Sequence, residues 1–439
     1  MRKRILLVMI FTAACLLGGC DMRTVDEMYC LPKRPESYNN LQSAVDLAME
    51  GREYCAPLSG ENLQTVQMAD LDGDGEREYL LFAKHSGEKP LQILIFRHEA
   101  GEYVLADTVE SSGTAFDLVE YVQMDGRGGM ELVVGRQLGG QVLRSVSVYT
   151  LTDGNLEQVL VTNYTKFLTC DMDSDELSEL MVLRPGQTDT DKGVAELYSM
   201  DDGVITRSNE ATMSGSADKL KRIITGKLHG GVPAVFVGST VEDSALITDI
   251  YALVDGVFTN VSISSESGTS VQTLRNYYVY ADDIDNDGVV ELPALIPMQP
   301  VEQGKPVEKQ DLIRWYAMGT DGTTMDKLYT YHDFVGGWYV ELGRQWADRI
   351  CVQQQGNAYE FYLWDKTFAE NQLIFVIYAF SGQNREEQAI SDNRFVLHRE
   401  ETTIYAAHLE VASGSIDISM EDLISSFHMI RQDWKTGEM

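Results

Sequence analysis

The chain contains the stretch Met68-Ala-Asp-Leu-Asp-Gly-Asp-Gly-Glu-Arg-Glu-Tyr-Leu-Leu81, in which acidic and small residues alternate. Gly73 and Gly75 allow the backbone to turn tightly enough for alternate side chains to converge on one point. The converging acidic residues lie at loop positions 1, 3, 5 and 9: Asp70, Asp72, Asp74 and Glu78. Because hard carboxylate oxygens in a flexible loop suit Ca²⁺, the stretch predicts a calcium site.

The same acidic frame occurs twice more along the chain. Its further copies are Asp171, Asp173, Asp175 and Glu179, and Asp283, Asp285, Asp287 and Glu291. At position 7 we expect a backbone carbonyl to complete each shell, from Glu76, Leu177 and Val289. Four carboxylates held together without a cation repel one another, so three copies favour ion binding over bare acidic turns. The sequence therefore predicts up to three Ca²⁺ sites with a structural role.

The acidic loops punctuate a longer repeat. Between residues 58 and 335 short strands with period-2 alternation are separated by Asp-Gly turns. Two further units lack the full frame: Gln123–Glu131 carries Arg127 at position 5, and Gly226–Gly238 has no acidic residue. A unit of about four strands and roughly 40–50 residues is the size of a propeller blade. We therefore expect a mainly β chain with a β-propeller of about five blades, and up to seven.

The three complete loops resemble the calcium loops of FG-GAP/VCBS-type repeats, known from integrin alpha-chain propellers and from bacterial surface proteins. This resemblance covers roughly residues 60–335 and implies a calcium-binding propeller. The sequence departs from the family at position 9, where Glu replaces the usual Asp. An EF-hand is excluded, because position 12 of the first loop is Leu81 within a predicted strand rather than a Glu before a helix.

The N-terminal segment predicts export and a lipid anchor. Residues 1–20 combine a basic start, an apolar run and Leu17-Gly-Gly-Cys20. This resembles a bacterial lipoprotein signal, in which Cys20 is lipidated and becomes the mature N-terminus, so we expect the chain at the extracytoplasmic face of a bacterial membrane. Residues 21–57 predict a tether and one helix capped by Asn39 or Asn40. Cys30 and Cys55 flank that helix and could form a disulfide, the alternative being free thiols.

Residues 336–439 lack acidic loops and predict a small C-terminal α+β domain. Expected strands are Glu360–Trp364, Leu373–Tyr378 and Thr403–Ala407. A final helix is predicted after Ser419, with an apolar stripe of Leu423, Phe427 and Ile430. The alternative interpretation assigns these strands to one or two more propeller blades.

Composition limits the functions to be considered. The formal net charge of −33 argues against nucleic acid and anionic headgroups as partners. The sequence contains no H-E-x-x-H, G-x-S-x-G or G-x-x-x-x-G-K-[ST] motif. Ser216–Lys219, Ser391–Asn393 and Lys435–Gly437 match short β-lactamase motifs but lack the expected helix and inner-strand context, so no catalytic residue is predicted. We therefore expect a binding or scaffolding protein for a protein, peptide or glycan ligand. The alternative is a cell-surface glycan lyase or hydrolase, which a cleft lined by Asp, Arg and Tyr away from the acidic loops would favour.

Overall fold

A computed structural model describes residues 36–431 except 140–142, 153, 187–191, 242–244, 277–278, 302–310, 348, 365–370 and 411–417. The predicted signal segment, Cys20 and Cys30 lie outside these residues. The chain divides into two compact units, which we describe separately. The first comprises Met1–Ala56, Gln64–Ala69 and Arg77–Ser112, and the second comprises Pro57–Leu63, Asp70–Glu76 and Gly113–Met439.

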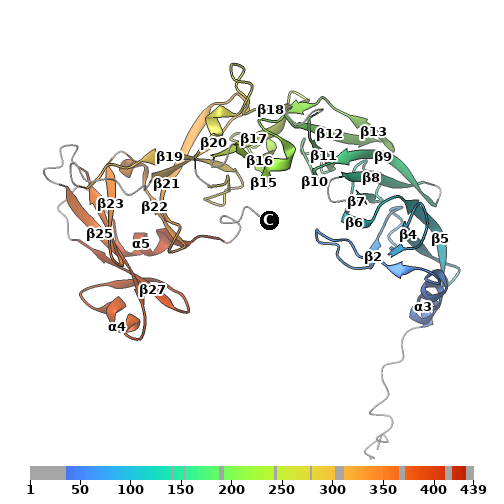
Figure 1. Ribbon diagram of the computed structural model, residues 1–439, viewed down its shortest axis with the longest axis horizontal. Coiled ribbons are helices and arrows are strands. Elements are labelled where there is room, and N and C mark those ends of the chain that lie inside the picture. The colour runs from blue at the N-terminus through green and yellow to red at the C-terminus, as the bar shows by residue number, and fades with distance from the viewer. Residues whose placement is uncertain are drawn as a thin grey trace, which may run out of the picture. The chain divides into compact units, whose positions relative to one another are not determined.

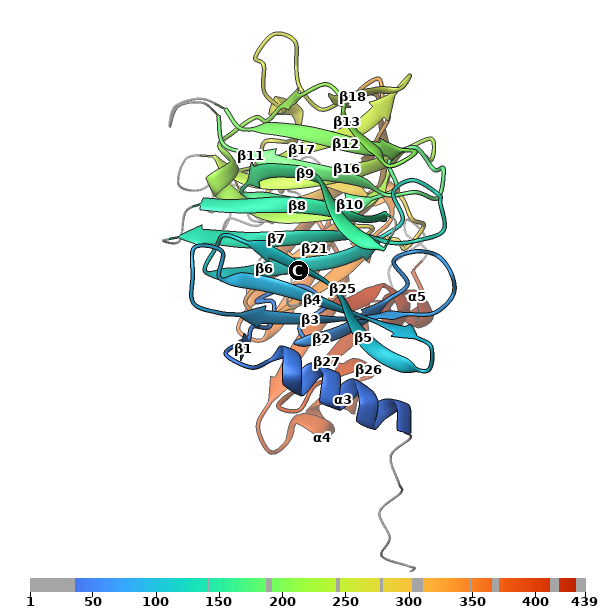
Figure 2. The ribbon, with the colours of Figure 1, turned by 90° about the vertical axis from the view of Figure 1, so that its right-hand side faces the viewer.

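The described residues of the first unit form one helix on one antiparallel sheet, named sheet 1. Its strands are β1 (Glu53–Tyr54), β2 (Val66–Ala69), β3 (Glu78–Lys84), β4 (Leu91–Glu99) and β5 (Glu102–Ser111). Helix α3 (Glu36–Ala48) lies along this sheet (Figure 2). Its Val45 and Ala48 are buried in a cluster with Leu81 and Phe96. The described helix runs from Glu36 to Ala48, so Asn39 and Asn40 lie inside it, and the prediction that one of them caps it was wrong.

The second unit contains five further antiparallel sheets in chain order (Figure 1). Sheet 2 has β6 (Ala115–Val122), β7 (Glu131–Gly139), β8 (Leu143–Thr152) and β9 (Asn155–Tyr164). Sheet 3 has β10 (Lys166–Cys170), β11 (Glu179–Arg184), β12 (Val194–Asp201), β13 (Val204–Arg207) and β14 (Ala211–Thr212). Sheet 4 has β15 (Leu220–Lys227), β16 (Pro233–Val241), β17 (Ala245–Val254) and β18 (Val257–Asn260).

The last two sheets share the C-terminal part of the chain. Sheet 5 has β19 (Glu291–Pro297), β20 (Asp311–Met318), β21 (Thr324–Asp333), β22 (Trp338–Leu342) and β28 (Phe427–Met429). Sheet 6 has β23 (Ile350–Gln355), β24 (Ala358–Leu363), β25 (Gln372–Ser381), β27 (Thr403–Leu409) and β26 (Phe395–Arg399). Two short helices accompany them, α4 (Arg385–Ile390) and α5 (Met420–Ser426).

Consecutive sheets of the second unit share hydrophobic cores. In β11, Leu180 and Val182 join a cluster with Val133 of sheet 2, whereas Met181 and Leu183 join one with Val235 of sheet 4. Successive side chains of a strand point to opposite faces, so both faces of sheet 3 are buried against its neighbours. Two further clusters connect sheet 4 to sheet 5 and sheet 5 to sheet 6. This face-to-face succession of antiparallel sheets of four or five strands is the architecture of propeller blades, and the prediction of a mainly β propeller fold is confirmed. The number of blades stays a prediction.

Each acidic loop lies directly before the strand that its position-9 glutamate begins, which is β3, β7, β11 or β19, and neighbouring loops contact one another. The backbone N–H of Met130 donates to the Asp70 carbonyl at 3.0 Å, and that of Ser178 donates to the Gln123 carbonyl at 2.7 Å. The backbone N–H of Val290 donates to the Lys227 carbonyl at 3.0 Å. In the first two pairs, position 8 of one loop donates to position 1 of the preceding loop, whereas Lys227 is the last residue of β15. These bonds align neighbouring loops.

The C-terminal region confirms the three predicted strands and corrects the predicted helix. The β21–β22 hairpin spans the predicted domain boundary at residues 335 and 336, which stays a prediction. Helix α5 has the predicted Ser419 cap, in a capping box with Asp422, and buries Leu423. The assignment of Phe427 and Ile430 to this helix was wrong. Phe427 belongs to β28, because the edge of β22 accepts another strand and Phe427 stacks on Trp338 there.

Two features bear on the predicted export of the chain, which are membrane-spanning helices and the disulfide. Within the described part of the chain, no helix has the length and apolar character needed to cross a membrane. The predicted disulfide involves Cys30, which is not described, and it stays a prediction.

Candidate metal centres

The acidic loops share one backbone conformation. Positions 4 and 6 have positive φ angles in all four 9-residue loops: Gly73 and Gly75, Gly126 and Gly128, Ser174 and Glu176, and Asn286 and Gly288. Glycine adopts this conformation without strain, whereas Ser174 and Glu176 do so at a cost of roughly 1–2 kcal/mol each. The third loop in the chain therefore keeps the turn although its glycines are absent.

Hydrogen bonds to the aspartates fix this turn. The Asp171 carboxylate accepts the N–H groups of Ser174 at 2.6 Å and Glu176 at 3.1 Å. Asp173 accepts from Asp175, and Asp175 accepts from Leu177. The first and last loops repeat the pattern through Asp70, Asp72, Asp74, Asp283, Asp285 and Asp287. Each loop thus orders its acidic side chains with its own backbone.

Three of the four predicted carboxylates converge in each complete loop. Ligand oxygens at positions 1, 3 and 9 lie within 4.8 Å of one another in three groups: Asp70, Asp72 and Glu78; Asp171, Asp173 and Glu179; Asp283, Asp285 and Glu291. These oxygen-only triads fit a hard divalent cation such as Ca²⁺. Participation of the aspartates at position 5, and of the carbonyls of Glu76, Leu177 and Val289, stays a prediction.

The glutamate at position 9 is fixed by a hydrogen bond from the backbone of its own loop. One oxygen of Glu179 accepts the backbone N–H of Met172 at 2.7 Å, and Glu291 accepts that of Ile284 at 3.1 Å. Both glutamates are buried. Their positions at the start of β11 and of β19 place one carboxylate oxygen on the loop backbone and leave the other for a cation.

The loop of residues 171–179 carries uncompensated negative charge. Among the described residues, no Lys, Arg or His lies within ion-pair distance of its carboxylates. Burial, followed by repulsion from Asp173, Asp175 and Asp171, raises the pKa of Glu179 to about 7. Burial and the neighbouring Asp175 also raise the pKa of Asp173. A bound divalent cation would remove this penalty, so the residues fit the predicted ion.

The loop of residues 123–131 contains its own cation. The Arg127 guanidinium pairs with Asp125 and donates to the Thr150 hydroxyl at 3.1 Å, and Thr150 in turn donates to Glu131 at 3.4 Å. Arg127 thus pairs with Asp125 directly, whereas its connection to Glu131 runs through Thr150. The degenerate loop of sheet 4 keeps only the turn, with positive φ at Gly230 and Gly231.

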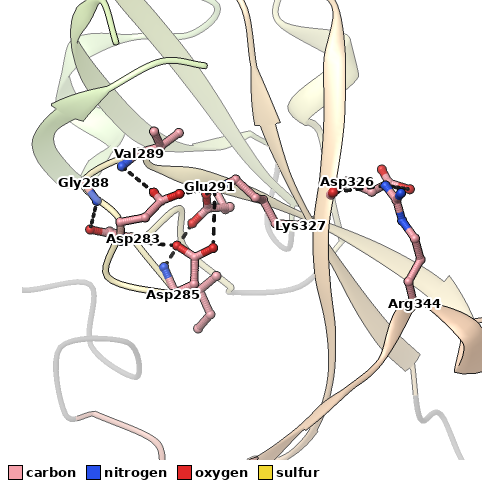
Figure 3. A network of polar contacts seen from close by, with 10 residues as sticks. Asp283, Asp285, Gly288, Val289, Glu291, Asp326, Lys327 and Arg344 are labelled. Atoms are coloured by element: carbon pink, nitrogen blue, oxygen red, sulfur yellow. Dashed lines mark hydrogen bonds and ion pairs between the residues drawn. The ribbon is translucent and has the colours of Figure 1, made fainter. Parts of the chain in front are cut away.

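The loop of residues 283–291 also meets a cation, which sequence reasoning missed. The Lys327 ammonium lies 3.4 Å from Asp285 and 3.7 Å from Glu291, and it pairs with Asp287 (Figure 3). Its hydrogen bond lowers the pKa of Asp287. Burial lowers the pKa of Lys327, but the surrounding carboxylates outweigh it, so that pKa is raised above its ordinary value. No local pattern marks Lys327, because it lies in a different strand, 36 residues beyond Glu291.

Two cavities adjoin the acidic loops. One, of about 540 Å³, is lined by Asp173 and Glu179 of sheet 3, by Ser199 and by Gly230 and Gly231 of sheet 4, among others. The other, of about 460 Å³, lies beside the loop of residues 283–291. Its polar and aromatic lining includes Asp283, Asn286, Tyr339, His398, His428 and Arg431. Both volumes lie in the range of roughly 300–1,000 Å³ that is usual for ligand pockets.

Comparisons with known proteins give structural likenesses only. No family model and no curated protein matches the sequence. Similar solved structures include an exotype rhamnogalacturonan lyase, with a TM-score of 0.30 and 12% identity, over 74% of this chain and 65% of that one. A rhamnogalacturonan lyase of Bacillus licheniformis gives a TM-score of 0.27 and 13% identity, over 73% and 72%. A protein from Lactobacillus plantarum gives 0.27 and 12%, over 72% and 85%. The fold assignment rests on the strand pairing and shared cores described above.

Proposed function

We propose that this chain is a lipid-anchored extracytoplasmic binding or scaffolding protein whose propeller, of the FG-GAP/VCBS type, is made rigid by Ca²⁺. The observation that carries the calcium role is the convergence of three carboxylates within 4.8 Å in a loop whose conformation is repeated from sheet to sheet. A cation there would clamp the turn between two strands. Because neighbouring loops are hydrogen-bonded in register, that rigidity would extend across several sheets.

The favoured ligand site is the cavity between sheets 3 and 4. Asp173 and Glu179 contribute to its wall, so a cation held by them would lie at its edge. Ser199 and Ser208 add hydroxyl groups, and Leu197 and Leu253 add apolar surface. Oxygen-rich ligands such as glycans match this lining, because their hydroxyl or carboxylate oxygens suit both the cation and the serines.

The second cavity favours binding over catalysis. His398 lies 3.0 Å from Glu400, His428 lies 2.9 Å from Glu341, and Arg431 pairs with Asp282. Each of these three side chains therefore lies against an acidic residue of the protein. Asp283 and Asn286 belong to the acidic loop, so this is not a separate Asp, Arg and Tyr cleft of the kind expected for an enzyme.

A glycan array tests the binding role. The purified chain should bind a defined set of glycans in the presence of Ca²⁺, and Ser199→Trp, which fills the cavity, should reduce that binding at least tenfold. Ser265→Trp, at an exposed position outside the cavity, is the matched control and should bind normally. Equal binding by the two variants would remove the cavity from the proposal, and binding to no glycan would argue for a protein or peptide ligand.

The membrane anchor has its own test. Replacing Cys20 with Ala should move the protein from the membrane fraction to the soluble fraction, because the acyl chains would have no attachment point. Immunoblotting of fractionated cells measures this, with Cys351→Ala as the control for loss of a thiol. Continued membrane association of the Cys20→Ala protein would refute lipidation at this residue.

A further inference from the structure

Lys327, whose ammonium group meets the loop of residues 283–291, lies at a β-bulge of strand β21. In sheet 5, Trp315 pairs with Leu328 and Tyr316 pairs with Asp326, so Lys327 is the extra residue of β21. A bulge re-aims the side chain of its extra residue. Asp326, one position earlier, instead lies beside Arg344, at 3.7 Å (Figure 3).

Equivalent bulges occur in two other sheets, with different residues. In sheet 1, Ile95 pairs with Asp107 and Phe96 with Leu105, which makes Ala106 the extra residue. In sheet 2, Val148 pairs with Leu160 and Tyr149 with Gln158, which makes Val159 the extra residue of β9. The three bulges occupy equivalent positions. In each sheet, the residue directly after the loop glutamate pairs with a residue of the next strand, namely Phe96, Tyr149 or Tyr316. The bulge lies opposite the step between that residue and the one before it. No such shift occurs between β12 and β13 of sheet 3. Among these positions, only that of sheet 5 carries a cation.

The ammonium group lies among three carboxylates of the frame. Lys327 is within ion-pair distance of Asp285, Asp287 and Glu291, and its side chain is only 15% exposed. A Ca²⁺ ion bound by the same carboxylates would lie close to this ammonium. Two cations cannot share that space without strong repulsion.

We propose that Lys327 is the built-in cation of the loop of residues 283–291, so that this loop does not bind Ca²⁺ and the chain binds two ions rather than three. The loops of residues 70–78 and 171–179 remain the calcium sites. Sheet 5 thereby keeps the rigid turn without depending on calcium, as sheet 2 does through Arg127. This inference rests on the proposed calcium role, but the two can fail separately.

Counting bound ions tests the proposal. Equilibrium dialysis of the purified full-length chain against millimolar Ca²⁺ should give two ions per chain, and Lys327→Val, the residue type found at the equivalent bulge of sheet 2, should bind one more. Lys166→Val, which removes an exposed lysine of β10, is the matched control and should bind as the unmodified chain does. The difference between the two variants tests Lys327, and equal counts would overturn the proposal. The count for the unmodified chain tests the calcium role of the other two loops.

A second measurement uses the unmodified chain and does not depend on the folding of a variant. Acetylation of Lys327 by an amine-reactive reagent, followed by mass spectrometry, should be slow and should change less than twofold when Ca²⁺ is added. A rise of tenfold or more on addition of Ca²⁺ would show that the ion displaces the ammonium, which would overturn the proposal.

Discussion

Removal of Ca²⁺ is expected to lower the stability of the folded chain by about 5 kcal/mol, if two sites with a dissociation constant near 10⁻⁴ M are compared in 10 mM Ca²⁺ and in chelator. The reason is mass action, since each site filled to about a hundred times its dissociation constant contributes roughly 2.7 kcal/mol. The melting temperature measured with EGTA should therefore be well below that measured with Ca²⁺. Mg²⁺ at the same concentration should restore little of the difference, because it demands a tighter octahedral shell.

A pair of variants separates this effect from a general effect of ionic strength. Asp171→Asn combined with Asp173→Asn should remove about half of the calcium-dependent shift in melting temperature, because one triad is lost. Asp218→Asn removes an exposed carboxylate outside the loops and should keep the whole shift. An equal melting temperature with and without Ca²⁺ would contradict the structural role proposed for the ions.

Trp338→Ala is expected to have the largest effect of any single substitution considered, about 3–5 kcal/mol of unfolding free energy. Trp338 is fully buried at the start of β22, and its ring lies 5.0 Å from that of Tyr359 of sheet 6 and 5.3 Å from that of Phe427 of β28. Truncation would leave a cavity between sheets 5 and 6 and weaken the attachment of the C-terminal strand.

Denaturant unfolding followed by circular dichroism measures this loss. Val335→Ala is the control, because Val335 is 99% exposed and its truncation should change the unfolding midpoint very little. A Trp338→Ala protein that unfolded at the midpoint of the control would show that sheets 5 and 6 do not depend on this shared core.

Much of the fold could be predicted, because the acidic loop marks the same point in successive units. The positions of Glu131, Glu179 and Glu291 at the start of β7, β11 and β19 follow from the spacing of the repeat alone. Strands such as β4 and β17 could be predicted because their residues are apolar and β-branched over several positions. Successive side chains of β11 point to opposite faces of sheet 3, so its run of apolar residues contributes both to the core shared with sheet 2 and to the core shared with sheet 4.

The features that could not be predicted depend on strand register and on pairing between distant segments. Lys327 reaches its loop only because a bulge in β21 changes the direction of its side chain. Phe427 continues the period of helix α5, yet it pairs with Val340, because a strand edge 87 residues earlier is available to it. Trp338, Tyr339 and Trp346 are aromatic residues with no local mark of burial, and all three lie in the core.

The most direct test of the central claim is an anomalous difference map from crystals of the chain grown in millimolar Ca²⁺. We predict a peak at about 2.3–2.6 Å from carboxylate oxygens of Asp171, Asp173 and Glu179, with a second peak in the loop of residues 70–78. The loop of residues 283–291 should show the Lys327 ammonium instead. Ordered carboxylates without a peak in the loop of residues 171–179 would contradict the assignment of the acidic loops as calcium sites.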